Sequence, residues 1–169
     1  LILIVGAGAA FSLIDSANRS VSSNNARVAG TNLGRELAEY ARTTDYDLLQ
    51  PSQLVAALRK HSTIKGTLSG STWTIVRRGV TYTISASVCT FDDPKDGLAA
   101  TPPDNACPTP AAVAGAPTEI NPDDFRRVTY TMTWKARGRK GTMSHATLVV
   151  NPAGGLGPRV KDFQEPTNE

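Results

Sequence analysis

A group of aspartates near the middle of the chain contains the residues best suited to bind a metal ion. Asp92, Asp93 and Asp96 lie close together, and Asp104 follows them. Carboxylate oxygens are the ligands that Ca²⁺ prefers, so this stretch is a candidate calcium site. Its spacing does not match the D-x-D-x-D-G pattern of an EF-hand, and its Asp-Pro and Asp-Gly pairs are ordinary turn signals. We therefore expect a solvated turn here, with calcium binding as the alternative.

Basic residues gather at the expected strand ends and turns, where they could bind phosphate groups. The chain as a whole is only mildly basic, with a formal charge of +3 and a pI near 9.0, which does not by itself indicate nucleic acid. Trp73, Tyr130 and Trp134 fall on the apolar phase of the strands and are not interleaved with the cations. We expect a solvated rim that blunts the sheet edges, with DNA binding as the alternative. The rim consists of Arg77, Arg78, Arg126, Arg127, Arg137, Arg139 and Lys140.

Nothing else in the sequence resembles a catalytic centre. His61 and His145 are the two histidines, and their separation does not fit the spacing of metal ligands. No serine lies in a nucleophile elbow, and the glycine-rich segments lack the lysine of a phosphate-binding loop. We therefore expect no enzymatic reaction and no cofactor other than the calcium considered above.

The two cysteines, Cys89 and Cys107, bracket the start of a long proline-rich stretch over residues 90–125. An even pair predicts one disulfide in a surface or secreted protein, whereas two isolated thiols are typical of the cytosol. The apolar N-terminus favours the surface location, so we expect the two to be bonded. The stretch 90–125 is too long and too rich in proline for a simple hairpin loop, and we interpret it as an excursion from a sheet.

The elements that must hold these residues begin with an apolar segment, residues 1–14, which carries no charge. A bilayer-spanning helix needs about 20 apolar residues. The apolar segment runs into an amphipathic pattern with a stripe at Leu33, Leu37, Tyr40 and Ala41, and one helix is predicted over residues 1–44, about 65 Å long. A domain of this size cannot cover that length, so we expect the first half to be an assembly interface; the alternative is a core helix of a soluble domain. The expected interface residues are Leu1, Ile2, Leu3, Ile4, Val5, Ala10, Phe11, Leu13 and Ile14.

Alternating apolar and polar residues predict four antiparallel strands, at 73–76, 80–88, 128–135 and 143–150. Such a sheet has one apolar face that needs a cover. We expect Leu33, Leu37 and Tyr40 of the helix to pack on that face, against Trp134 among others. A short helix over residues 53–61 is predicted to be capped by Ser52. The fold class is thus α+β, with a long N-terminal helix on a four-stranded antiparallel sheet.

This pattern divides the chain into two parts, which we name here. The stem is residues 1–28, the apolar and protruding portion of the helix. The head is residues 29–169, which contains the rest of the helix, the sheet, the excursion over 90–125 and an irregular tail over 151–169.

The order of these features resembles the type IV pilin and pseudopilin family, in particular minor pilins of Gram-positive, actinobacterial kind. The resemblance is carried by the helix SLIDSANRSVSSNNARVAGTNLGRELAEYAR and by VTYTISASVCTFDDPKDG, DDFRRVTYTMTW and TLVVNPAGGLGP in the head. It implies a structural subunit, inserted in the cytoplasmic membrane before assembly, that joins other pilin subunits in a cell-surface filament or secretion pseudopilus. A pilus-associated adhesin or DNA-uptake receptor, anchored by the same helix, is the alternative.

The sequence departs from the family at its N-terminus. The prepilin peptidase site, a glycine followed by an aromatic residue with a glutamate at the fifth mature position, is not present, and position 5 is Val5. The apolar run is also about ten residues shorter than the family's. From these departures we expect that the first stretch of the mature helix is missing from this sequence.

Overall fold

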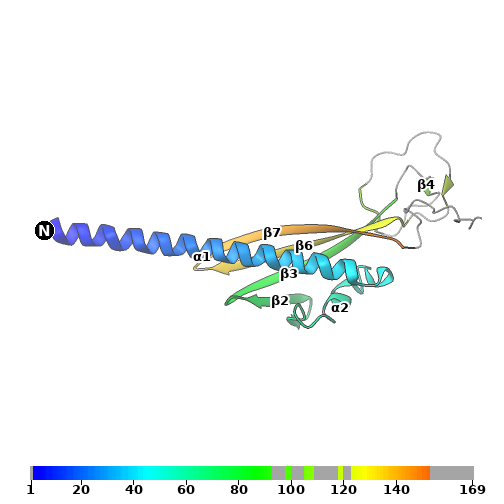
Figure 1. The fold of residues 1–169 in the computed structure, drawn as a ribbon, viewed down its shortest axis with the longest axis horizontal. Helices are drawn as coiled ribbons and strands as arrows, with labels where there is room; N and C mark the ends of the chain where they lie inside the picture. Colours follow the sequence, from blue (N-terminus) through cyan, green and yellow to red (C-terminus); the bar gives the residue numbers. More distant parts are fainter. Residues whose placement is uncertain (1, 93–97, 100–104, 109–117, 120–122, 153–169) are drawn as a thin grey trace, which may run out of the picture.

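The computed structural model describes residues 2–92, 98–99, 105–108, 118–119 and 123–152, with the backbone alone described for residues 2–11, 98–99 and 118–119. One long helix lies along one face of an antiparallel sheet (Figure 1), so the α+β fold class is confirmed. The elements are α1 (Ile2–Thr43), a 3-10 helix η1 (Tyr46–Leu48), α2 (Leu54–Leu58), β1 (Thr67–Ser69), β2 (Thr72–Arg77), β3 (Val80–Phe91), β4 (Leu98–Ala99), β5 (Thr118–Glu119), β6 (Phe125–Ala136) and β7 (Arg139–Val150).

The main sheet has five strands in the order β1-β2-β3-β6-β7, and every neighbouring pair is antiparallel. The chain therefore winds through it as a meander, with the excursion inserted between β3 and β6. Two tight turns close the hairpins β2–β3 and β6–β7, and in both turns an arginine and a glycine adopt positive φ: Arg78 and Gly79, then Arg137 and Gly138. Positive φ at both central residues is the type I′ geometry that matches the twist of a hairpin. Strands β4 and β5 form a separate parallel pair.

The sheet has one strand more than the sequence predicted, and α2 is shorter than predicted. All three residues of β1 are exposed, so it has no alternation of buried and exposed positions to signal a strand. Helix α2 begins at Leu54 after Gln53, without a side-chain capping bond, and residues 59–64 continue as turns and a bend. The predicted cap at Ser52 was therefore wrong, and backbone bonds from Gln53 and Leu54 to the Gln50 carbonyl start the segment instead.

The core lies between α1, the short helices and the inner face of the sheet. From α1, Leu33, Leu37 and Ala41 are fully buried, at the spacing that a helix needs to keep one face on the sheet. Alternate residues of the central strands meet them, and residues around η1 and α2 close the remaining part of the cluster. The fully buried large side chains are Trp73, Tyr82, Tyr130, Leu33, Leu37, Leu49, Leu54, Leu58, Ile64, Met132, Val128 and Asp124.

Two glycines bring α1 unusually close to β7. A Cβ placed on Gly34 would lie 2.3 Å from Cδ2 of His145, and one placed on Gly30 would lie 2.9 Å from Sδ of Met143. Helix α1 nevertheless runs without a break from Ile2 to Thr43. The glycines, each of which costs about 1 kcal/mol in a helix interior, therefore serve close packing of helix on sheet rather than a kink.

Candidate functional site: the projecting helix and the two ends of the head

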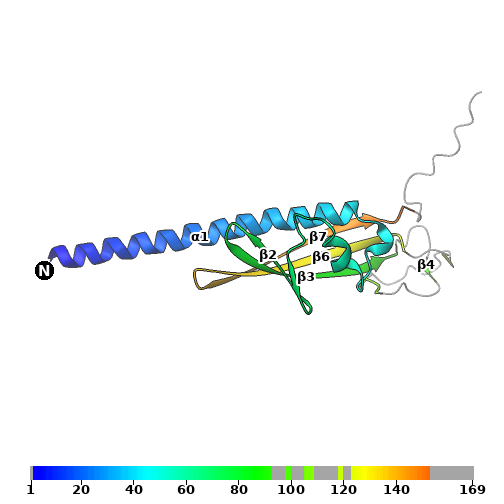
Figure 2. The same cartoon turned by 90° about the horizontal axis from the view of Figure 1, so that it is seen from below.

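The outer part of the stem projects from the head (Figures 1 and 2). Every residue from 12 to 21 is exposed, and the apolar side chains of Leu13, Ile14 and Val21 are exposed by 72%, 57% and 59%. From Ile2 to Val21 the helix is about 30 Å long. A row of apolar side chains in this setting marks an interaction surface.

For several predicted assembly residues, the structure describes the backbone but not the side chain. Ile2, Leu3, Ile4, Val5, Ala10 and Phe11 lie on the helical backbone of α1, and their side chains are outside the description, as is Leu1 altogether. Within the described residues, no helix combines the length and the apolar character that crossing a membrane requires.

Contact between stem and head begins at Ser22 and Ser23, and Ala26 is the first buried residue. The hydroxyl of Tyr82 donates a hydrogen bond to the carbonyl oxygen of Ala26 at 2.6 Å, in a buried position. Burial raises the pKa of Tyr82. This bond fixes the point at which the helix leaves the sheet. Tyr82 falls within the predicted strand 80–88, but no local pattern in the sequence pointed to its partner.

The residues predicted to join helix and sheet pack within the head. Leu33 and Leu37 are in the core cluster, and Tyr40 and Trp134 are half-buried against it. Tyr40 also shares a hydrogen bond of 2.7 Å with Thr63 through their hydroxyl oxygens.

The predicted basic rim divides into separate groups instead of forming one row. Arg78, Arg137, Arg139 and Lys140 are exposed at the two hairpin turns, which point toward the stem (Figures 1 and 2). The remaining members have partners elsewhere. Arg77 bonds Glu36 at 3.0 Å, Arg126 bonds Asp123 at 2.5 Å, and Arg127 lies over the Phe91 ring.

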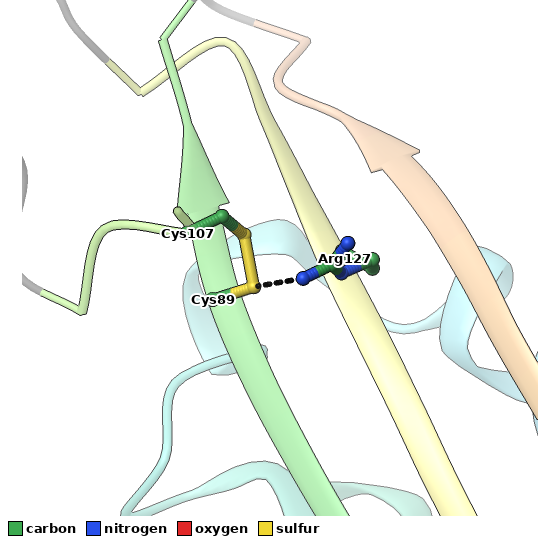
Figure 3. Close-up of a disulfide and its surroundings, with 3 residues drawn as sticks. All are labelled: Cys89, Cys107 and Arg127. Atoms are coloured by element: carbon green, nitrogen blue, oxygen red, sulfur yellow. Dashed lines mark hydrogen bonds between the residues drawn. A yellow bond between two sulfur atoms is a disulfide. The ribbon is translucent and has the colours of Figure 1, made fainter. Parts of the chain in front are cut away.

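The disulfide lies at the opposite end of the head from the stem. Cys89 of β3 is bonded to Cys107, as predicted, and Arg127 Nη2 donates to Sγ of Cys89 at 3.6 Å (Figure 3). Backbone bonds reinforce the link: Thr90 N donates to the Asn105 carbonyl at 3.0 Å, and Cys107 N donates to the Thr90 carbonyl at 2.7 Å. The returning segment is thus held beside the end of β3.

A charged network stabilises the same end of the head. The carboxylate of Asp123 accepts hydrogen bonds from the Tyr46 hydroxyl and from Arg126, whose guanidinium lies 4.2 Å from the centre of the Tyr46 ring. Burial, and then the nearby Asp123 carboxylate, raise the pKa of Tyr46 far above its usual range. Asp123 and Arg126 also line an open hollow of about 340 Å³, together with Gln50 and Asn105.

The candidate calcium residues are mostly beyond the described part of the chain. Asp92 is described, whereas Asp93, Asp96 and Asp104 lie outside the described residues. Among the residues that are described, no three His, Cys, Asp or Glu side chains are grouped so that they could hold a metal ion.

The histidines take part in packing. The His61 ring stacks on the Tyr40 ring with 4.0 Å between centroids, and His145 lies against Gly34 of α1. The two rings contact different residues, and their contacts are those of packing at the helix.

No protein-family model, no curated protein and no solved structure matches this chain. What the geometry establishes is the architecture, which is pilin-like: a long N-terminal helix, free in its first half and packed on an antiparallel sheet in its second.

Proposed function

We propose that this chain is a structural subunit of a type IV pilus-like filament or a secretion pseudopilus, and that it assembles through the stem. The observation that carries the proposal is the division of α1. Leu33 and Leu37 are buried in the head, whereas Leu13 and Ile14 of the same unbroken helix are exposed. Exposed apolar side chains on a projecting helix gain stability when equivalent helices pack together, at about 25 cal/mol for each Å² removed from water.

In this proposal the membrane holds the stem before assembly and neighbouring stems hold it afterwards, with the heads facing outward. The chain is proposed to belong to the pilin and pseudopilin family on the strength of the quoted residues and the architecture. No reaction and no cofactor are assigned to it. The proposed location is the cell surface.

The experiment places a charge on the stem. Leu13→Glu and Ile14→Glu should abolish incorporation into filaments, because an unpaired carboxylate buried among apolar helices is costly. The readouts are the amount of the protein in sheared surface fractions and electron micrographs of those fractions. Val76→Glu is the matched control, since Val76 is an apolar side chain of the head that is 60% exposed.

The head variant should assemble like the wild type, and circular dichroism with thiol labelling should show that all variants keep the fold and the disulfide. Normal filaments from both stem variants would contradict the proposal.

A second function is favoured by the hollow beside Asp123 and Arg126, at the end of the head farthest from the stem. In that alternative the chain is an anchored binding module, an adhesin or a receptor. It would then be found at the surface of cells without entering a polymer, and the stem variants would detach it rather than prevent polymerisation.

A further inference from the structure

We propose that the basic side chains around the base of the head form a docking surface for anionic phospholipid headgroups. We call this surface the collar, and it consists of Arg27, at the end of the stem next to the head, and of Arg78, Arg137, Arg139 and Lys140 of the head. The inference rests on the proposed function, because it requires the stem to lie in a membrane. It adds a partner for the head itself, which the stem-to-stem contact does not provide.

The collar carries positive charge that the described residues do not neutralise. All five side chains are exposed, and within the described part of the chain none of them has a carboxylate within ion-pair distance. Elsewhere on the head, Arg77 and Arg126 are paired, whereas Arg35, Lys60 and Lys65 are exposed and have no ion pair within the described residues. What distinguishes the collar is therefore that its cations lie together beside the helix. Near the collar, Asp15 is held by Arg19 at 2.6 Å, so that acid does not offset the collar.

The conformation of two collar arginines supports a role for their charge. Arg78 has φ 48° and Arg137 has φ 43°, and each is the first central residue of its hairpin turn. Asparagine, aspartate and glycine are the residues preferred at that position, and a side chain such as arginine is strained there. The turn would form better without arginine, yet both hairpins place one at the tip. Strain that recurs at equivalent positions points to a function of the side chain.

The hairpins place these charges at the level along α1 that lipid headgroups would occupy if the apolar segment lay in the hydrocarbon. Arg78 and Arg137 line one hollow with Asn18 and Val21 of the helix, and a second hollow on the helix joins Arg27 to Arg139 and Lys140. Asn18 is four residues beyond Ile14, the last residue of the apolar segment, which is about 6 Å along the helix. The headgroup layer of one leaflet is about 5–7 Å thick.

With the apolar segment in the hydrocarbon, the collar would therefore face lipid phosphates at less than one Debye length, about 8 Å in physiological salt.

The same charges favour a membrane over nucleic acid because of their position. They lie beside α1 at the end of the head from which the stem projects. A long duplex bound there would collide with the projecting part of α1. Trp134, the aromatic residue nearest to them, is half-buried and lies across Gly141, where a Cβ would come within 2.4 Å of its ring. It is therefore not free to stack on bases.

The test measures binding of the full chain to sedimenting vesicles of neutral phosphatidylcholine and of a mixture with anionic phosphatidylglycerol. The collar variant is Arg78→Asn, Arg137→Asn and Arg139→Gln. Asparagine is well suited to the two turn positions, so this variant should fold at least as stably as the wild type, as thermal unfolding can check. The control removes the same charge elsewhere on exposed parts of the head: Arg35→Gln, Lys60→Gln and Lys65→Gln.

The wild type should bind anionic vesicles more tightly than neutral ones. The collar variant should lose about fivefold in anionic binding for each charge removed, or about two orders of magnitude at low salt, and the control should retain most of the wild-type preference. Neutral-vesicle binding should be the same for all three proteins, because it depends on the stem.

Equal losses in the collar variant and the control, or no loss in the collar variant, would overturn the inference. So would a duplex DNA affinity that falls with the collar while anionic-vesicle binding does not. These outcomes leave the proposed function standing, because that is judged by filament incorporation of the Leu13 and Ile14 variants. Collar-dependent binding without any effect of the stem variants on filaments would instead refute the proposed function.

Discussion

Replacing Gly34 by alanine tests the close contact between α1 and β7. Alanine should stabilise a helix interior by about 1 kcal/mol relative to glycine. Here the added Cβ would lie 2.3 Å from Cδ2 of His145, whereas ordinary contact begins at 3.4 Å. The imidazole must recede by about 1 Å within a packed interface, and such overpacking costs about 1–3 kcal/mol.

We therefore expect a net loss of about 1 kcal/mol, the opposite sign from the helix propensity alone. For a domain of this size that lowers Tm by about 2–4 °C.

The assay is urea and thermal unfolding of four proteins that combine Gly34→Ala with His145→Ala. Without the imidazole, the alanine at position 34 has room, so the substitution should become stabilising by about 1 kcal/mol. Asn32→Ala, at an exposed position of the same helix, is the control for propensity and should stabilise in both backgrounds. If Gly34→Ala raised stability equally with and without His145, the close approach of helix and sheet would be refuted.

Other consequences of the structure can be measured on the same protein. Replacing Cys89 and Cys107 by serine removes a disulfide between residues that are 18 positions apart in the sequence. This should lower the free energy of unfolding by about 3 kcal/mol in the chain-entropy model. An unchanged denaturation midpoint would contradict this prediction. Tyr82→Phe removes the bond to Ala26 and should cost about 1–3 kcal/mol because a buried partner is lost, with faster amide exchange where the stem leaves the head. Because the pKa of Tyr46 is raised in the folded state, its contribution to stability is complete below the unfolded value near pH 10 and declines as pH rises above it. Tyr46→Phe should therefore make alkaline unfolding less steep, and an identical slope would show that Tyr46 does not titrate with unfolding.

The sequence predicted the structure correctly where a single local periodicity of apolar residues determined which face is buried. The alternation through Tyr82 and Ile84, and the helical stripe at Leu33 and Leu37, each require a single buried face, and both faces are buried as expected. Gly34 was ambiguous, because its effect on the helix depends on His145, which is far away in the chain. A glycine in a helical pattern indicates a kink or a close contact, and only the residue opposite distinguishes the two.

Charged residues were harder to place than apolar ones. Asp123 binds Tyr46, which is 77 positions away in the sequence, and no periodicity connects them. Arg78 and Arg126 belonged to one predicted rim, yet one lies at a hairpin tip beside the stem and the other is paired at the far end of the head. Their separation follows from the lengths of the strands, which carry the turns to one end and the strand starts to the other.

The continuity of α1 also has a mechanical consequence. A pull on the stem is transmitted along the helix axis into the head, because the helix has no break at which it could bend away. Strands β3, β6 and β7 run lengthwise beside that axis (Figures 1 and 2). Tension in this direction shears the hydrogen-bond ladders, so many bonds must yield together, whereas a pull across the sheet would open them one after another. A head attached in this way should resist stretching along the stem more strongly than peeling from β1 or β7.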